Sequence, residues 1–211
     1  MTQSNPVTHM KHLLALISAL CCVQLAAFSQ TDWYYFPDEI YFVKEVSAKD
    51  LRGKEFRYQI AVKAAATDTF SKVRINGVAA GKGREDFLNN SNFSKQQSTE
   101  SEWTIYTISG TIPQEAWKLW FYSAVNGNGE FYFDDVQFYI KEGNDWVQLE
   151  LSNPSFEEDH KNIFKGYYVN NRQTPHLKTA ISKTVSHHGE HSLHVTTHGL
   201  RPTVPRSLTK Q

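Results

Sequence analysis

The strict alternation of residues 56–63 constrains the fold more than any other feature of this sequence. Apolar side chains occupy every second position there: Phe56, Tyr58, Ile60 and Val62. This period of two is typical of a strand with one buried face. Similar patterns predict strands at 39–46, 70–76, 103–108, 117–125 and 127–140, with an edge strand at 146–151. Short strands at this spacing, with almost no helical pattern, predict an all-β fold, an antiparallel β-sandwich.

The stretch at 127–140, GNGEFYFDDVQFYI, is the strand around which we expect the others to pack. Two glycines form a turn before it, and an acidic pair interrupts its aromatic residues. The aromatic content of the chain, 13%, suits a sheet-rich core because aromatic residues favour pleated, half-buried surfaces. By contrast, residues 77–101 are polar and show little periodicity, so they form either a long functional loop or an irregular strand.

Residues 1–29 predict a secretory signal peptide. Lys11 precedes an apolar run at 13–27, and Ala27 and Ser29 are small residues suited to cleavage after Ser29. The apolar run is shorter than the about 20 residues of a membrane-spanning helix. We therefore expect a secreted, periplasmic or cell-envelope protein with no membrane span after cleavage.

The cysteines and charges exclude several functions. Cys21 and Cys22, the two cysteines of the chain, lie in the signal segment, so the mature chain has no disulfide or cysteine nucleophile, which fits bacterial export. The 22 basic residues are balanced by 22 acidic residues, so no net field attracts DNA or an anionic membrane. Neither a Gly-x-Ser-x-Gly elbow nor a His-Glu-x-x-His motif occurs. We expect a non-catalytic protein with no nucleic-acid partner.

The composition changes after residue 151, which marks a predicted domain boundary. Residues 30–151 would form the main β-sandwich. Residues 152–199 contain only two weaker strand patterns, at 179–185 and 192–197, and half a sandwich cannot bury enough apolar surface alone. We expect residues 152–199 to form a partial second β module that docks on the first or stays mobile. Residues 200–211 are polar and contain proline, which predicts a disordered tail.

Three segments carry a resemblance to a known family: KDLRGKEFRY at 49–58, EWTIYTISGTIP at 102–113 and GNGEFYFDDVQF at 127–138. In their order and spacing they resemble the later two-thirds of galactose-binding-like jelly rolls, which include many carbohydrate-binding modules. NPSFEED at 153–159 and HHGEHSLHV at 187–195 resemble the opening of such a module. In this family an opening of that kind would come before residue 40, where it is missing here, and the second module stops after its first strands.

The resemblance implies a non-catalytic jelly roll that binds a saccharide or a cell-envelope polymer. Such modules often precede a hydrolase domain in secreted bacterial proteins, of the erythromycin-esterase-like or tail-specific-protease-like kind. None of that catalytic sequence is found here, so the chain could be the front end of a truncated secreted hydrolase. The alternative is a structural or protein-interaction β-sandwich with no small ligand.

Aromatic side chains are the candidate ligand contacts. The alternation at 117–125 places Trp120 and Tyr122 on one strand face, and rings on an outer sheet face can stack on the C–H face of a pyranose. Trp103 and Tyr106 could flank them. In the alternative, the second sheet covers Trp120 and Tyr122, and both belong to the core. Saccharide binding requires Trp103, Trp120 or Tyr122 to be exposed, whereas a structural role predicts all three inside.

The resemblance also implies a structural Ca²⁺ site. In similar modules an acidic residue of the closing strand often helps to hold the ion, and Asp134 and Asp135 occupy that place here. Glu157 matches the ligand of the opening segment. Carboxylate oxygens are suitable ligands for Ca²⁺. The alternative is that one aspartate faces solvent and the other caps a loop.

Overall fold

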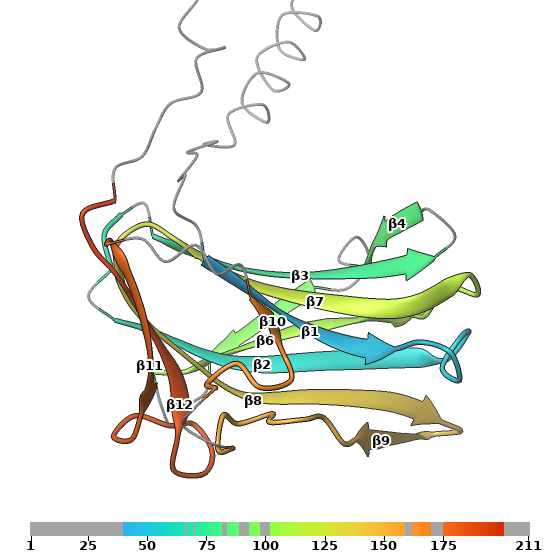
Figure 1. Ribbon diagram of the computed structural model, residues 1–211. Coiled ribbons are helices and arrows are strands. Elements are labelled where there is room, and N and C mark those ends of the chain that lie inside the picture. Colours follow the sequence, from blue (N-terminus) through green and yellow to red (C-terminus); the bar gives the residue numbers. More distant parts are fainter. Residues whose placement is uncertain are drawn as a thin grey trace, which may run out of the picture. The chain divides into compact units, whose positions relative to one another are not determined.

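The computed structural model describes residues 40–65, 67–69, 71–81, 84–88, 93–97, 102–158, 162–169 and 175–200. In this part of the chain twelve β-strands form two antiparallel sheets (Figure 1), and all of them belong to one compact unit. This confirms the predicted all-β sandwich. The predicted signal peptide and nearly all of the predicted tail lie outside the described residues. No helix among the described residues is long and apolar enough to cross a membrane.

One sheet has five strands. In spatial order they are β10 (Tyr168–Val169), β1 (Ile40–Ser47), β7 (Ala116–Asn126), β3 (Lys72–Gly81) and β4 (Arg84–Phe87). The other sheet has seven strands. They are β11 (Leu177–Ser182), β12 (Ser192–Thr197), β8 (Gly129–Glu142), β2 (Glu55–Ala65), β6 (Thr104–Thr111) and β5 (Phe93–Gln97), with β9 (Asp145–Leu149) also paired to β8.

The core lies between the sheets and is built from the apolar faces that alternation predicted. The alternating residues of β2 are all buried: Phe56, Tyr58, Ile60 and Val62. The ring of Tyr58 stacks on Phe121 of β7, with 4.0 Å between centroids and 1° between ring planes. The segment predicted as a loop or irregular strand contributes β4, β5 and the end of β3, which the sequence pattern did not locate.

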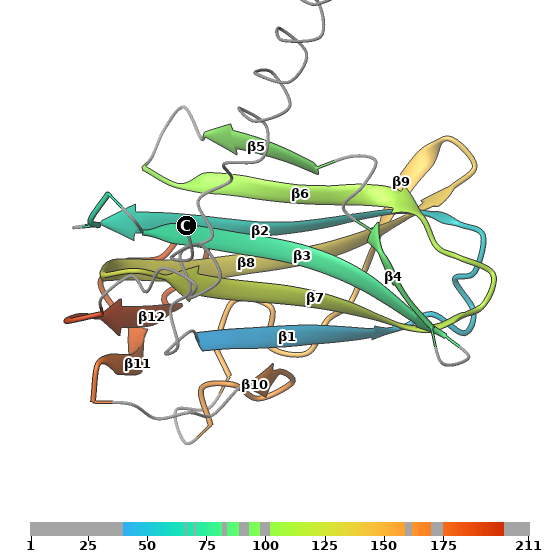
Figure 2. The same ribbon diagram turned by 90° about the horizontal axis from the view of Figure 1, so that it is seen from above.

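The segment predicted as a partial second module completes this sandwich instead. β12 pairs with β8, placing Leu193 opposite Phe133, and β10 pairs with β1 (Figure 2). In the connection from β9 to β10, Phe156 is buried in the core. Its ring contacts Phe42, with ring centroids 6.2 Å apart. The boundary predicted after residue 151 is therefore not a domain boundary, because β8 and β1 would otherwise leave edges and apolar surface uncovered.

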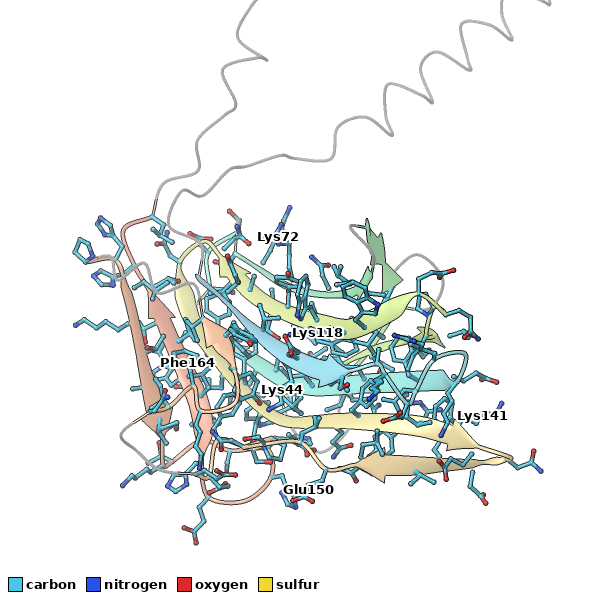
Figure 3. The ribbon with its side chains drawn as sticks, turned by 45° about the vertical axis from the view of Figure 1, so that its right-hand side comes forward. Lys44, Lys72, Lys118, Lys141, Glu150 and Phe164 are labelled. Carbon is cyan, nitrogen blue, oxygen red and sulfur yellow. The ribbon has the colours of Figure 1, made fainter. Side chains whose placement is uncertain are left out.

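A buried lysine holds the C-terminal segment against β1. Lys44 points toward the core and donates hydrogen bonds to the carbonyl oxygens of Ser152 and Gly166 (Figure 3). Its ammonium group also lies 4.1 Å from the centroid of the Tyr167 ring. Burial lowers the pKa of Lys44 to about 8, although Glu158 opposes the shift. The carbonyl oxygens and the aromatic ring replace the water that a buried cation loses.

Leu193→Ala should destabilise the whole sandwich by about 2–5 kcal/mol, because it leaves a cavity in the shared core. Denaturant unfolding of the full chain, followed by tryptophan fluorescence, measures this change. Val147→Ala is the matched control, since Val147 is 39% exposed, and it should change the free energy of unfolding little. A separate early transition, with the main transition unchanged, would show that residues 152–199 fold independently.

Candidate functional site

The outer face of the five-stranded sheet carries four aromatic side chains from three strands, and we call this surface the aromatic face. It consists of Tyr41 of β1, Trp120 and Tyr122 of β7, and Tyr168 of β10. Val43 pairs with both Tyr122 and Tyr168 in the backbone register, so these three residues form one row across the sheet. Tyr41 is 37% exposed and Tyr168 is 61% exposed, while Trp120 and Tyr122 are half-buried.

Trp120 is held in place by its edge. Its indole N–H donates to Oε2 of Glu45 at 3.0 Å, and Oε1 of Glu45 lies 2.8 Å from the Lys118 ammonium group. Partial burial raises the pKa of Glu45, but the hydrogen bonds from Lys118 and Trp120 outweigh it, so the net shift is downward. Glu45 is therefore ionised at neutral pH, and it orients the indole without using the ring face.

The structure decides between the two predicted positions of Trp120 and Tyr122. Their neighbours Leu119 and Phe121 are fully buried between the sheets, so Trp120 and Tyr122 point away from the core. The alternative in which the second sheet covers them is wrong. The physical reason is the pleat of β7, since successive side chains of a strand point to opposite faces of its sheet.

Trp103 and Tyr106 do not flank Trp120 and Tyr122. Tyr106 lies on β6, in the other sheet, and its side chain is buried in the core, which raises its pKa. Trp103, just before β6, is only 4% exposed and packs with Ala61 and Tyr132 on the outer face of that sheet. The predicted grouping of four residues is therefore wrong, because sequence periodicity does not show which sheet a strand joins.

Two members of the aromatic face were not predicted. Tyr41 alternates with the core residue Phe42, so the strand pattern at 39–46 contained the signal that could have identified it. Tyr168 belongs to a strand of two residues, which is too short to show periodicity. Its position is set by pairing with Val43.

The acidic pair of β8 lies at a bulge. Gln137 pairs with Gln59 and Asp134 with Ala61, so two residues of β8 lie opposite one residue of β2. At this bulge Asp135 adopts a positive φ of 50°. Its Oδ1 accepts a hydrogen bond of 2.7 Å from the Gln137 side chain, and its Oδ2 lies 3.3 Å from Nδ1 of His187.

Asp134 is fully buried and binds backbone amides. Its Oδ2 accepts hydrogen bonds from the N–H groups of His187 and His188, at 2.7 and 3.0 Å, and Oδ1 accepts one from Asp135 at 2.7 Å. Burial raises the pKa of Asp134 to about 6, while these three amide bonds oppose the shift. The carboxylate thus fixes the loop between β11 and β12 over the middle of β8.

Glu157 fixes the other end of the same loop. Its Oε1 accepts hydrogen bonds from the N–H groups of Glu190 and His191, at 2.8 and 2.9 Å, and Oε2 lies 2.5 Å from Nδ1 of His191. Burial raises the pKa of Glu157, but these contacts outweigh it and the net shift is downward. Gly189, just before Glu190, has a φ of +74°, and a side chain there would collide with the Glu157 carboxylate.

These contacts do not fit the predicted calcium site as they stand. The oxygens of Asp134 and Glu157 face N–H donors, which a cation would have to displace. In the part of the chain that the structure describes, no group of three His, Asp or Glu side chains is arranged to hold a metal. Asp134 agrees with the alternative in which one aspartate holds a loop. A structural Ca²⁺ at Asp134, Asp135 and Glu157 stays a prediction.

Comparison with known proteins finds no matching family model, no matching curated protein and no matching solved structure. The function of the site is therefore argued from its geometry.

The contribution of Asp134 to the free energy of unfolding should become more favourable as the pH falls from about 7 to about 4. Its pKa is about 6 in the folded protein against an ordinary 3.8, so the folded state takes up the proton first. The stability of the wild type relative to Asp134→Asn should therefore increase by up to about 3 kcal/mol over this range. Denaturant unfolding at a series of pH values measures the difference.

Glu157→Gln is the matched control, because the contribution of Glu157 to stability should change with pH in the opposite direction. Because the pKa of Glu157 is lowered from 4.5 in the folded protein, its contribution is present above that pH and is lost as the pH falls further. An advantage of the wild type over Asp134→Asn that shrinks with falling pH would contradict the assignment for Asp134.

Proposed function

We propose that the protein is an exported, non-catalytic module that binds a saccharide or a hydroxyl-rich cell-envelope polymer at the aromatic face. One observation carries this proposal: the Trp120 ring is held at its edge by Glu45 and is flanked by other half-exposed rings on an outer sheet face. Exposed aromatic surface is unfavourable in water, so a contiguous patch of it marks a binding surface.

The arrangement of the rings suits a chain of sugars. Trp120 and Tyr122 are two positions apart on one strand, about 6.6 Å along it, and Tyr168 lies two strands away, about 9.5 Å across the sheet. The Tyr41 and Tyr122 rings are 6.0 Å apart and tilted by 56°. Flat rings spread over such a distance can contact the C–H faces of successive pyranose units. Lys118 and Glu45 at the rim add polar contacts.

The galactose-binding-like assignment is supported by the way three resembling segments meet. Glu157, in the segment like a module's opening, binds the loop of the HHGEHSLHV segment. Asp134, in the segment like a module's closing strand, binds the same loop from the other side. The segment that resembles a module's opening therefore lies beside the segment that resembles its closing strand, although the opening-like segment comes later in the sequence. Attachment to a hydrolase domain remains part of this proposal and rests on the resemblance alone.

The structural alternative has less support. It required Trp103, Trp120 and Tyr122 to be packed inside, whereas Trp120 and Tyr122 are half-exposed and Trp103 is buried on the outer face of the other sheet. A protein partner could also cover exposed aromatic rings. The experiment below distinguishes this case, because a protein-contact face would bind none of the polysaccharides.

Trp120→Ala should weaken binding of the polysaccharide about tenfold or more, which corresponds to about 1.4 kcal/mol. The full chain is first screened against neutral polysaccharides, and the affinity for the best ligand is measured by calorimetry. Trp117→Ala is the matched control, because Trp117 lies at the start of the same strand, is 54% exposed and is outside the aromatic face. An equal loss of affinity in Trp120→Ala and Trp117→Ala would overturn the proposal, and so would the absence of binding by the wild type.

A further inference from the structure

The outer face of the seven-stranded sheet contains an arginine whose charge is not balanced. Arg57 of β2 is half-buried, and its guanidinium carbon lies 4.3 Å from the centroid of the Trp146 ring on β9. The structure gives this guanidinium group no hydrogen bond or ion pair within the described part of the chain. This cation–π contact uses the charge of the guanidinium group, and a guanidinium group carries five N–H donors that can also bind a carboxylate.

Two carboxylates at this end of the sheet are bound to other groups. Both oxygens of Glu55, two residues earlier, accept hydrogen bonds from Lys141 at 3.0 and 3.2 Å. Glu142 pairs with Lys54 at 3.1 Å. Figure 3 shows Lys141 near the end of β8, where the hairpin to β9 begins. Among these charged residues, Arg57 is the one without a carboxylate partner in the part of the chain that the structure describes.

A row of neutral hydrogen-bonding groups continues from Arg57 along the strands. Together with Arg57 and Trp146 we call this surface the polar face; the other members are Gln59, Thr107, Gln137 and Tyr139. Register places Tyr139 opposite Arg57, and Gln59 opposite both Gln137 and Thr107. From Arg57 to the level of Asp135 the row is about 13 Å long, at about 3.3 Å per residue.

Side-chain hydrogen bonds hold this row in one arrangement. Gln59 donates to the Thr107 hydroxyl at 3.1 Å, the Tyr139 hydroxyl donates to Gln137 at 2.5 Å, and Gln137 donates to Asp135 at 2.7 Å. Burial raises the pKa of Tyr139, so the phenol keeps its proton at neutral pH. Groups already fixed in this way lose little conformational entropy when a ligand binds.

We propose that the polar face is a second binding site, which takes an acidic saccharide with Arg57 as the anchor of its carboxylate. A guanidinium group binds a carboxylate through two parallel N–H···O bonds, and the cation–π contact with Trp146 restricts the Arg57 side chain before the ligand arrives. The amide and hydroxyl groups of the row then bind ring hydroxyls of the same chain. This site is separate from the aromatic face, because it lies on the other sheet.

The neighbouring side chains favour a saccharide over an acidic peptide. The centres of protein interfaces are rich in aromatic and apolar contacts, whereas the row beside Arg57 offers amides and hydroxyls. The rings of Trp146 and Tyr139 add apolar surface, and the Arg57 guanidinium lies over the Trp146 ring. A hydroxyl-rich ligand that places one carboxylate at Arg57 matches both the single positive charge and the neutral row.

The test compares polygalacturonate with its fully methyl-esterified form, which has the same rings and linkages without the charge. The full chain should bind the acid at least tenfold more tightly than the ester. Arg57→Met should abolish this preference, and Arg57→Lys should keep only part of it, because lysine supplies the charge without the planar fork. Lys72→Met is the matched control: it removes one cation from β3, in the other sheet, and should leave the preference unchanged.

Three outcomes would overturn the second site. The first is equal affinity of the wild type for the acid and the ester. The second is a loss of the preference in Lys72→Met as large as that in Arg57→Met. The third is Arg57-dependent binding of poly-glutamate as tight as that of polygalacturonate. An unchanged melting temperature of Arg57→Lys shows that its effect is on binding and not on folding. Trp120→Ala separates the two proposals, because it should weaken neutral ligands at the aromatic face and leave the preference for the acid intact.

Discussion

A buried carboxylate in the middle of β8 joins the two parts of this sandwich. Asp134 loses its water on folding, which is costly unless every oxygen finds a donor. The backbone amides of His187, His188 and Asp135 supply these donors. The bulge makes this geometry available, and the amide of Val136 is satisfied by the carbonyl of Pro154. A single side chain thus determines where the C-terminal segment crosses the sheet.

Two further contacts complete this attachment, and both functional faces depend on them. Lys44 binds carbonyl groups of the segment that leads into β10, and so it sets the position of Tyr168 on the aromatic face. Glu157 holds the far end of the loop, whose His187 lies against Asp135 at the end of the polar face. Loss of the C-terminal segment would therefore remove Tyr168 from the aromatic face, the His187 contact with Asp135 at the end of the polar face, and part of the core.

The two sheets present different chemistry to solvent. The five-stranded sheet exposes rings that offer flat apolar contacts, while the described side chains of the seven-stranded sheet include amides, hydroxyls and the guanidinium group of Arg57. In a sandwich the inner faces supply the core, so the outer faces are free to vary without loss of stability. A module with two such faces could bind a polymer on one side and an acidic saccharide on the other.

The sequence by itself determined the strands of the first part that show alternation, and their buried faces, but not β4 and β5, which lie in a segment without periodicity. Alternation is a local property of the pleat, so Leu119 and Phe121 could be separated from Trp120 and Tyr122 without knowledge of any partner. Only the tertiary structure decided which sheet each strand joined, and therefore that Trp103 and Tyr106 lie apart from Trp120. It also decided that residues 152–199 complete the first sandwich, and that a two-residue strand brings in Tyr168. These outcomes depend on which edges and apolar surfaces the other strands leave uncovered, and that is a property of the whole fold.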